Sequence, residues 1–340
     1  TRKESSAASD VYKRQAYTEE DAVEDIVDNA EKSILQVTKD DRKGGFVPVG
    51  EAVHQSLENI TRQAQNHEPI TGLPTGFAGL DSFTTGLQKG NLIIVAARPS
   101  MGKTAFVLNI AKNISLSHAR KTVAFFSLEM GRDELVHRLL SSTALIDSQR
   151  LKTGRIQGEK EWLNLSKAAS VFMEAPLYID DTPGVTVSQI RSKCRRLKAE
   201  KGLDVVIIDY LQLMTGKNSR YSESRQQEIS EISRSLKSLA RELNVPVIAL
   251  SQLSRGPDAR PNHRPMLSDL RESGSIEQDA DLVCFLYRDA YYNKEIEEGN
   301  PLQRETEVIL AKNRNGPTGV VKMSFAGEFT LFYELTDSCL

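Results

Sequence analysis

Eight consecutive residues combine the types needed to hold the phosphates of a nucleotide. Residues 97–104 read Ala-Arg-Pro-Ser-Met-Gly-Lys-Thr and lie between the apolar run Leu92–Ala96 and an amphipathic segment at 105–118. A strand, then x-x-x-x-Gly-Lys-Thr, then a helix is the arrangement of a phosphate-binding loop. Its backbone N–H groups and the helix N-terminus would face the triphosphate. Lys103 would reach the β- and γ-phosphates, and the Thr104 hydroxyl would bind Mg²⁺.

The loop departs from the usual pattern in one place, because Ala97 stands where the first glycine is expected. A glycine-containing turn between a strand and a helix would look similar, but the full spacing favours binding of a nucleoside triphosphate. We therefore predict an ATP site with Mg²⁺. The residues predicted to contact the nucleotide are Ala97, Arg98, Pro99, Ser100, Met101, Gly102, Lys103 and Thr104.

Three further polar residues come directly after apolar runs, where ligands of parallel sheets bind. Asp209 follows Val205–Ile208 and is predicted to help hold the metal, although a buried strand can also end in Asp at a helix cap. Glu129 is predicted to orient the water that attacks the γ-phosphate, with a helix cap or a surface carboxylate as the alternative. Gln252 is predicted to sense the γ-phosphate, with an ordinary loop residue as the alternative.

Basic residues gather in loops and beyond the last strands. Four arginines are spread over the segment after Gln252, and a second basic loop covers 215–225. Both would suit phosphate binding, although a solvated basic loop has the same composition. Lys312 and Arg314 come just after an apolar run and could act as cations on a γ-phosphate, or simply form a surface turn. The basic residues of the two loops are Arg255, Arg260, Arg264 and Arg271, and Lys217, Arg220 and Arg225.

The elements that must position these side chains alternate between strand and helix from Gly72 onward. Strands are expected at 92–96, 123–127, 203–208, 247–250 and 281–286, and helices near 105–118, 132–144, 159–174, 186–201 and 224–242. This alternation predicts an α/β fold with a mainly parallel sheet and helices on both faces. A terminal antiparallel hairpin is expected from 305–311 and 319–325 around Asn315-Gly316-Pro317.

The first 68 residues have a different character. Apolar residues recur at helical spacing in 23–35, a Gly- and Pro-containing linker follows at 41–50, and a second apolar stripe runs from Val53 to Ala64. That stripe would pack either on its own domain or on a neighbouring subunit. Residues 1–15 are expected to be disordered or added artificially, so that the chain would be a fragment. The expected boundaries are 1–15, a helix at 16–40, a linker with its helix at 41–68, and an ATPase domain at 69–340.

Composition excludes several classes of protein. The 340 residues are 39% hydrophobic and 26% charged with a formal net charge of −2, which argues against a uniformly basic nucleic-acid binder. No apolar run is long enough to span a bilayer, and no signal segment opens the chain. The three cysteines and five histidines show no metal-ligand spacing. We therefore expect a protein of the reducing cytoplasm without membrane contact.

Six motifs in order along the chain resemble those of the DnaB family of bacterial replicative helicases. The resemblance runs from about Tyr17 to near the C-terminus, and Ala97 is normal in this family. The motifs are Ala-Arg-Pro-Ser-Met-Gly-Lys-Thr, Phe-Ser-Leu-Glu-Met, Ile-Ile-Asp-Tyr-Leu-Gln-Leu-Met, Leu-Ser-Gln-Leu-Ser-Arg, Asp-Leu-Arg-Glu-Ser-Gly-Ser-Ile-Glu-Gln-Asp-Ala-Asp and Ala-Lys-Asn-Arg-Asn-Gly-Pro-Thr-Gly.

The resemblance implies a RecA-like ATPase domain in a homohexameric ring that moves 5′→3′ on single-stranded DNA. It implies that Lys312 and Arg314 act in trans on a neighbour's nucleotide, and that the helix at 50–66 docks on the adjacent subunit. The residues implied to contact DNA are Arg271, Glu272 and Gly274. Residues 16–40 would be the last helix of a largely missing N-terminal domain, which the family uses to recruit primase. A helicase loader is the other expected partner.

Two other readings remain open at the level of sequence. A RecA-like recombination or regulatory ATPase would share the phosphate-binding loop and the strand-end acids. A non-enzymatic scaffold with an inactive loop is a third possibility, but the complete set of polar residues counts against it. That set is Lys103, Thr104, Glu129, Asp209 and Gln252.

Overall fold

The computed structural model describes residues 48–66, 70–214, 225–270, 274–293 and 304–334. Its contacts divide the chain into two units, 1–68 and 69–340. In the first unit, the helix α3 (Val49–Asn66) covers the second stripe expected from the sequence, whereas the segment expected to form a helix at 16–40 lies outside the described residues. Val49, Val53, Leu57 and Ile60 of α3 are each more than half exposed.

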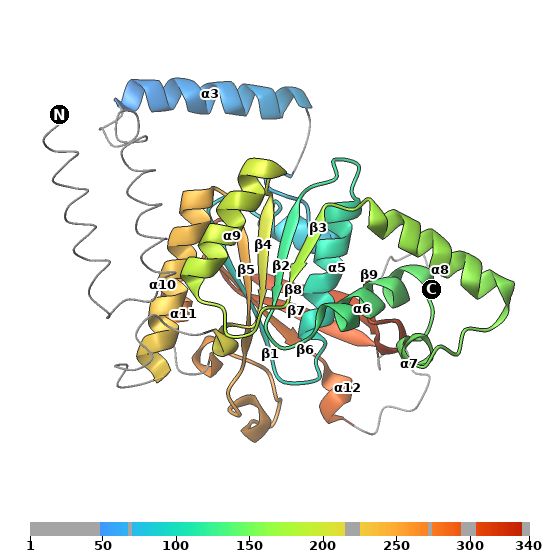
Figure 1. Ribbon diagram of the computed structural model, residues 1–340. Helices are drawn as coiled ribbons and strands as arrows, with labels where there is room; N and C mark the ends of the chain where they lie inside the picture. The colour runs from blue at the N-terminus through green and yellow to red at the C-terminus, as the bar shows by residue number, and fades with distance from the viewer. Residues whose placement is uncertain (1–47, 67–69, 215–224, 271–273, 294–303, 335–340) are drawn as a thin grey trace, which may run out of the picture. The chain divides into compact units, whose positions relative to one another are not determined.

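The second unit is built on one sheet (Figure 1). Its strand order is β3-β2-β4-β5-β1-β6-β7-β8-β9, in which the strands from β3 to β6 are parallel and those from β6 to β9 antiparallel. The fold class predicted from the sequence is therefore confirmed, as is the terminal hairpin. The strands are β1 (Leu92–Ala97), β2 (Val123–Ser127), β3 (Leu177–Asp180), β4 (Val205–Asp209), β5 (Val247–Gln252), β6 (Leu282–Tyr287), β7 (Glu305–Asn313), β8 (Gly319–Ala326) and β9 (Leu331–Glu334).

Helices cover both faces of the sheet, with α5 and α6 on one side and α9, α10 and α11 on the other (Figure 1). The helices of this unit are α4 (Ala78–Thr84), α5 (Lys103–Leu116), α6 (Arg132–Ala144), α7 (Ser148–Lys152), α8 (Gly158–Met173), α9 (Val187–Glu200), α10 (Arg225–Leu243), α11 (Gly274–Asp279) and α12 (Asp289–Tyr292). Among the described helices, none is long and apolar enough to cross a membrane.

The strand β1 explains why the central strands read as continuous apolar runs. Ile93, Val95 and Ala97 belong to the core beneath α5, and the intervening residues Leu92, Ile94 and Ala96 belong to the core beneath α10. All six are buried, because side chains alternate between two faces that are both covered by helices. The burial fixes the strand rigidly at the point where the loop 97–104 leaves it.

Several short elements were not anticipated. The strand β3 has four residues and lies at the edge of the sheet, where its side chains are at most partly buried and give no continuous apolar run. The strand β9 and the short helices α4, α7, α11 and α12 were also missed. Elements of this length carry too few residues to establish a period, so the sequence signal is weak.

Candidate functional site

The phosphate-binding loop of the sequence connects β1 to α5. Ser100 and Gly102 have positive φ angles of 66° and 91°, and Gly102 is the N-cap of α5. A Cβ atom on Gly102 would lie 3.1 Å from Cζ of Phe332. Both the backbone angle and this close ring therefore require glycine, and the turn aims the first N–H groups of α5 at the space in front of the loop.

Asp209 forms the buried centre of the site. Its Oδ2 accepts a hydrogen bond of 2.6 Å from the Thr104 hydroxyl, and its Oδ1 lies 4.0 Å from Nζ of Lys103. The residue is fully buried, and Oδ1 has no hydrogen-bond partner. Burial raises the pKa of Asp209, which the positive charge of Lys103 and the hydrogen bond from Thr104 oppose. Burial likewise lowers the pKa of Lys103, against the attraction of Asp209 and Glu129.

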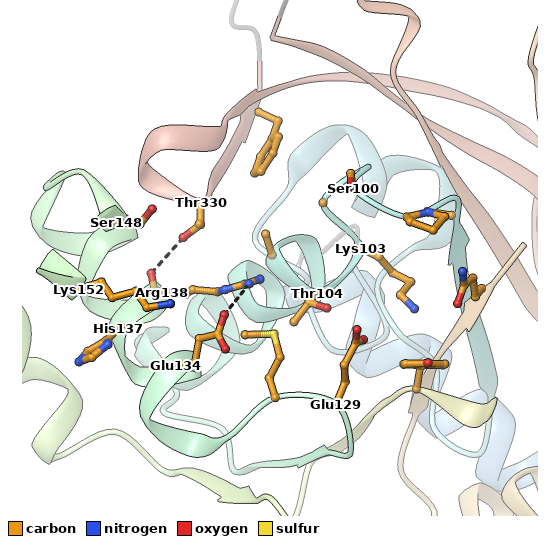
Figure 2. A pocket seen from close by; sticks show the side chains of 18 of the residues that line it. Ser100, Lys103, Thr104, Glu129, Glu134, His137, Arg138, Ser148, Lys152 and Thr330 are labelled. Atoms are coloured by element: carbon orange, nitrogen blue, oxygen red, sulfur yellow. Dashed lines mark hydrogen bonds and ion pairs between the residues drawn. The ribbon is translucent and has the colours of Figure 1, made fainter. Parts of the chain in front are cut away.

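Strand register brings the other predicted residues to the same end of the parallel strands, where their carboxyl ends meet; we call this the carboxyl edge. The last residues of β1 and β5, Ala97 and Gln252, are paired directly, and Ser127 at the end of β2 pairs with Asp209. Glu129 follows two residues after Ser127, whose hydroxyl donates to the carbonyl of Met130 at 2.6 Å and fixes the turn. The Glu129 side chain is exposed and lies beside Lys103 and Thr104 in Figure 2.

A pocket of about 760 Å³ lies at this edge (Figure 2), lined by residues around the fully buried Asp209 rather than by Asp209 itself. Seven of the eight residues of the loop line it together with Glu129 and Gln252, whereas the Met101 side chain is buried in the core beneath α5. Met101 could therefore contribute only its backbone to nucleotide binding. Arg98 lines the pocket, but its guanidinium bonds to Asp258 and to the Leu253 carbonyl.

The pocket extends well beyond the predicted residues. In Figure 2 its other end is formed by side chains of α6 and α7, including His137, Arg138 and Lys152, beside Thr330. Phe325 and Tyr210 add aromatic walls. Sequence analysis missed these residues because they come from segments up to about two hundred positions apart, and none stands in a motif that marks phosphate chemistry.

Gln212 is a further residue that sequence analysis missed. It lies in the short 3₁₀ helix Leu211–Leu213, and its Nε2 donates to Oγ of Ser251 at 2.9 Å. Its Oε1 accepts from the backbone N–H of Gln252 at 3.3 Å. Gln212 thus holds the backbone that carries Gln252. The sequence signal that could have identified Gln212 was its position three residues after Asp209.

Lys312 and Arg314 lie at the opposite end of the parallel strands from the loop, beside the amino ends of β6 and β1; we call this the amino edge. Asn313 pairs with Leu282 at the start of β6, and Leu282 pairs with Ile93 at the start of β1. The backbone N–H of Arg314 donates to Asp281, whose own N–H donates to Leu92. Leu92 and Ala97 are five positions apart along β1, or about 17 Å. The structure therefore does not bring these two cations to the pocket of their own chain.

Contacts within the chain hold both cations at that edge. Nζ of Lys312 donates to the carbonyl of Glu277 at 2.5 Å, and Nη2 of Arg314 donates to the carbonyl of Gln278 at 2.5 Å. Nη1 of Arg314 also lies 3.6 Å from Oδ1 of Asp281. These acceptors lie at and just beyond the C-terminal end of α11, where a helix favours positive charge.

The predicted DNA-contacting residues are only partly described. Arg271 and Glu272 lie outside the described residues, and Gly274 begins α11. In the preceding loop, Arg260 forms two hydrogen bonds with Asp269 and Arg264 pairs with Glu307, so both arginines serve the protein's own structure. In the second basic loop, Lys217 and Arg220 lie outside the described residues, while Arg225 begins α10 and pairs with Glu228.

The donor set at Asp209 fits Mg²⁺ bound beside a nucleotide. Mg²⁺ is held by one or two carboxylates together with substrate phosphates and waters rather than by a cage of protein ligands. The buried, unpartnered Oδ1 of Asp209 and the adjacent Thr104 hydroxyl suit that role. No cluster of three or more His, Cys, Asp or Glu residues suited to a metal occurs within the described ranges.

Comparison with known proteins gives a consistent picture. The family model for the DnaB-like helicase C-terminal domain matches residues 72–334. The replicative DNA helicase DnaC of Bacillus subtilis is 52% identical over 319 residues, which cover 94% of this chain and 69% of that protein. The replicative DNA helicase DnaB of Geobacillus stearothermophilus is 51% identical with the same coverage.

Two solved structures resemble most of the chain. A solved ATPase domain matches with a TM-score of 0.79 and 44% identity, covering 86% of this chain and all of that one. A DnaB-like replicative helicase, described with its interactions with primase, matches with a TM-score of 0.76 and 38% identity, covering 98% of this chain and 77% of that one. The fold is therefore of the RecA-like α/β type found in helicase ATPase domains.

Proposed function

Because the chain belongs to the family of DnaB-like replicative helicases, we propose that it hydrolyses ATP at a site shared by two copies. The chain is an ATP-driven DNA helicase of replication. The comparisons give no support to the alternative of a recombination or regulatory ATPase.

One subunit supplies the phosphate and metal half of the site. The backbone of residues 97–104 and the N-terminus of α5 hold the phosphates of ATP, with Lys103 at the β- and γ-phosphates. Thr104 and Asp209 hold Mg²⁺, which neutralises charge on the phosphates when bound. Glu129, exposed into the pocket beside Lys103, orients the attacking water. Gln252 sits where it can detect the γ-phosphate, and Phe325 offers an aromatic wall to a nucleobase.

The neighbouring subunit supplies Lys312 and Arg314. One observation carries this part of the proposal: these cations lie at the amino edge of the sheet, about 17 Å along β1 from the loop of their own chain. Cations at that edge reach a γ-phosphate only if a second copy presents its pocket there. The identical arrangement at each interface closes a ring, and we assign six subunits to it by family resemblance.

DNA binding is assigned to Arg271, Glu272 and Gly274, which follow the loop that begins at Gln252. Residues 16–40 are assigned to the end of an N-terminal helical domain, and 41–68 to a linker whose helix α3 docks on the adjacent subunit. The exposed apolar side chains of α3 support that assignment. Primase and a loader are proposed as partners, since one solved relative is described with primase.

A fork-unwinding assay tests the function directly. The full chain is incubated with ATP and Mg²⁺ on forked duplexes that carry either a free 5′ tail or a free 3′ tail for loading. The proposal predicts unwinding only when the strand with the 5′ tail can be entered, because translocation runs 5′→3′. DNA-stimulated ATP hydrolysis without strand separation would instead favour a RecA-like ATPase, and no stimulation by DNA would point to a scaffold.

A further inference from the structure

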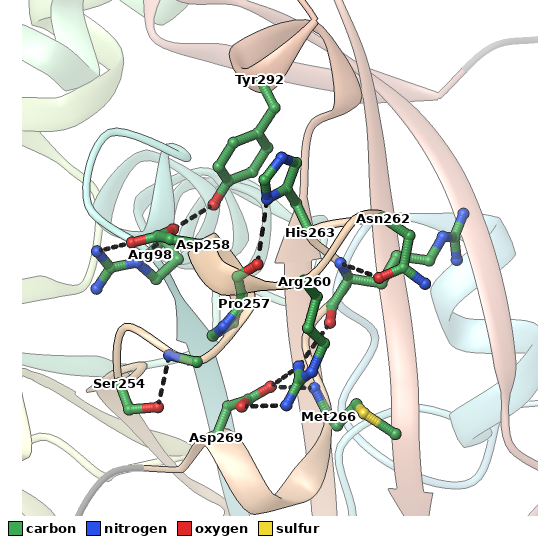
Figure 3. A network of polar contacts seen from close by, with 12 residues as sticks. Arg98, Ser254, Pro257, Asp258, Arg260, Asn262, His263, Met266, Asp269 and Tyr292 are labelled. Carbon is green, nitrogen blue, oxygen red and sulfur yellow. Dashed lines mark hydrogen bonds and ion pairs between the residues drawn. The ribbon is translucent and has the colours of Figure 1, made fainter.

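In the phosphate-binding loop, the Arg98 guanidinium forms three hydrogen bonds within the chain. Its Nε and Nη2 donate to Oδ1 and Oδ2 of Asp258 at 3.1 and 2.5 Å (Figure 3). Its Nη1 donates to the carbonyl of Leu253 at 3.1 Å. The side chain is only 17% exposed. A guanidinium bound in this forked way is fixed in direction as well as in position.

Asp258 is held from its other side by an aromatic pair. The Tyr292 hydroxyl donates to Oδ1 of Asp258 at 3.0 Å, and the ring of His263 stacks on Tyr292 with 4.1 Å between centroids (Figure 3). Burial alone would raise the pKa of Asp258, but the hydrogen bonds from Arg98 and Tyr292 bring it below its ordinary range. The carboxylate therefore stays charged as the partner of Arg98.

The loop that carries Asp258 is closed on itself. Leu253 and Leu270, at its two ends, pair as an antiparallel bridge, and the N–H of Ser254 donates to the carbonyl of Asp269 at 2.9 Å. Asp269 in turn accepts from both Nη atoms of Arg260 and from the N–H of Met266. These cross-links make residues 253–270 one body, so a displacement at Asp258 is transmitted to Leu270.

The loop 253–270 is tied to the phosphate-binding loop at two points. The N–H of Leu253 donates to the carbonyl of Ala97 at 3.1 Å, and the Arg98–Asp258 pair adds a second connection. Because the two connections are separated, a rotation of the phosphate-binding loop is passed on to the loop 253–270. With a single connection the two loops could pivot about it. Leu270 directly precedes Arg271, the first residue assigned to DNA binding.

We propose that Arg98 and Asp258 are positioning residues that couple nucleotide binding at the phosphate-binding loop to the affinity for single-stranded DNA. This inference rests on the proposed function, in which the residues after Leu270 contact DNA. The Arg98–Asp258 pair acts in addition to the sensor Gln252, because the pair responds to the position of the phosphate-binding loop. By linkage, DNA binding must change nucleotide affinity by the same factor.

The test compares single-stranded DNA affinity in two nucleotide states. Dissociation constants for a labelled oligo-dT are measured by fluorescence anisotropy with the full chain, once with ADP and once with a non-hydrolysable ATP analogue. For the unaltered chain we expect the two constants to differ by about fivefold or more, as is typical of allosteric coupling. In Asp258→Asn we expect the ratio to fall to within about twofold of one, with DNA-free ATP hydrolysis and thermal unfolding unchanged.

Two variants control for an effect on folding. Tyr292→Phe removes one hydrogen bond to Asp258 but leaves both from Arg98, so its ratio should match that of the unaltered chain. Asp258→Glu keeps the carboxylate and should recover part of the coupling. In a double-mutant cycle, adding Arg98→Lys to Asp258→Asn should cause little further loss of coupling, because both changes break the same link.

The outcomes separate this inference from the proposed function. A ratio unchanged in Asp258→Asn, or a ratio of one in the unaltered chain, overturns the inference even if forks are still unwound. An Asp258→Asn protein that melts earlier but keeps its ratio makes the pair purely structural and also overturns it. Loss of coupling in Asp258→Asn, with normal coupling in Tyr292→Phe, supports it whether or not the unwinding assay succeeds.

Discussion

The two edges of the parallel sheet differ in how their charged groups are satisfied. At the carboxyl edge, Asp209 keeps one buried oxygen without a hydrogen-bond partner and Glu129 projects into an open pocket. At the amino edge, Nζ of Lys312 and Nη2 of Arg314 donate to backbone carbonyls near the end of α11. The first edge presents polar groups to an open pocket, whereas the second holds its two cations in place by contacts within the chain, with the Arg314 side chain still 47% exposed.

This difference fits the proposed division of catalytic residues between two copies. In the proposed mechanism the carboxyl edge supplies the lysine, hydroxyl and carboxylates that bind a nucleotide with Mg²⁺, and Arg98, Arg138 and Lys152 also line its pocket. The amino edge holds two cations beyond the reach of their own pocket. We propose that the amino edge of one copy supplies Lys312 and Arg314 to the carboxyl edge of the next, so that two copies make one site.

Lys103→Ala should have the largest effect, because it removes the cation of the carboxyl edge itself. Without it the β- and γ-phosphates lose their compensating charge, and we expect ATP hydrolysis and unwinding to be abolished. Steady-state hydrolysis and fork unwinding measure this. Near-normal hydrolysis in this variant would mean that the carboxyl edge is not the catalytic one.

Glu129→Gln should separate ATP binding from ATP hydrolysis at the carboxyl edge. The amide keeps the shape of the side chain but cannot draw a proton from water, so turnover should fall by about 10²–10⁴ while ATP still binds. Binding of a fluorescent ATP analogue and single-turnover hydrolysis give the two quantities. If turnover stays normal, Glu129 has no part in the mechanism.

Arg271→Ala should alter DNA binding without touching either edge. Loss of one phosphate contact should weaken single-stranded DNA binding with little dependence on sequence and make the salt slope shallower by about one. DNA-free hydrolysis should persist, while its stimulation by DNA should fall. Titrations at several salt concentrations check this, and an unchanged slope would move the DNA site to residues 215–225.

Lys112→Met should affect stability alone and so serve as a control outside both edges. Burial on α5 lowers the Lys112 pKa to about 8, whereas the unfolded chain keeps it near 10.5. Between these values the unfolded chain binds more protons, so stability should rise with pH in that window. Methionine should remove this rise and increase the free energy of unfolding at neutral pH by up to about 3 kcal/mol, since one pKa unit corresponds to about 1.4 kcal/mol. Denaturant unfolding at pH 7 to 10 measures both effects, with ATP hydrolysis as the reference expected to stay constant.

The sequence predicted the carboxyl edge better than the rest of the site. Asp209 and Gln252 follow apolar runs, and strands buried on both faces are easily recognised, so their meeting place follows from the fold. The position of Lys312 and Arg314 depends on strand register across β6 and β7, which no local pattern contains. The contacts of Arg98 and Gln212 are with partners more than thirty residues away, so only the folded chain reveals them.

The exposed loops show the same limit. Arg260 and Arg264 have the composition of a phosphate-binding segment, yet acidic partners that are distant in sequence or folded back on the loop satisfy them. Charge alone did not distinguish these arginines from one that stays available to a ligand. Whether an arginine is available to a ligand depends on its hydrogen-bond partners, which are set by the tertiary structure.

The most direct test of the shared site is to mix two inactive variants. Arg314→Ala should still bind ATP, while its hydrolysis falls by about 10³–10⁵, as for other arginine fingers. Lys103→Ala is inactive for a different reason, so co-assembled subunits contain some interfaces that pair an intact Lys103 with an intact Arg314. Recovery of ATP hydrolysis on mixing is the predicted result. Absence of recovery despite demonstrated co-assembly would contradict the account and leave Arg314 with a role only within its own chain.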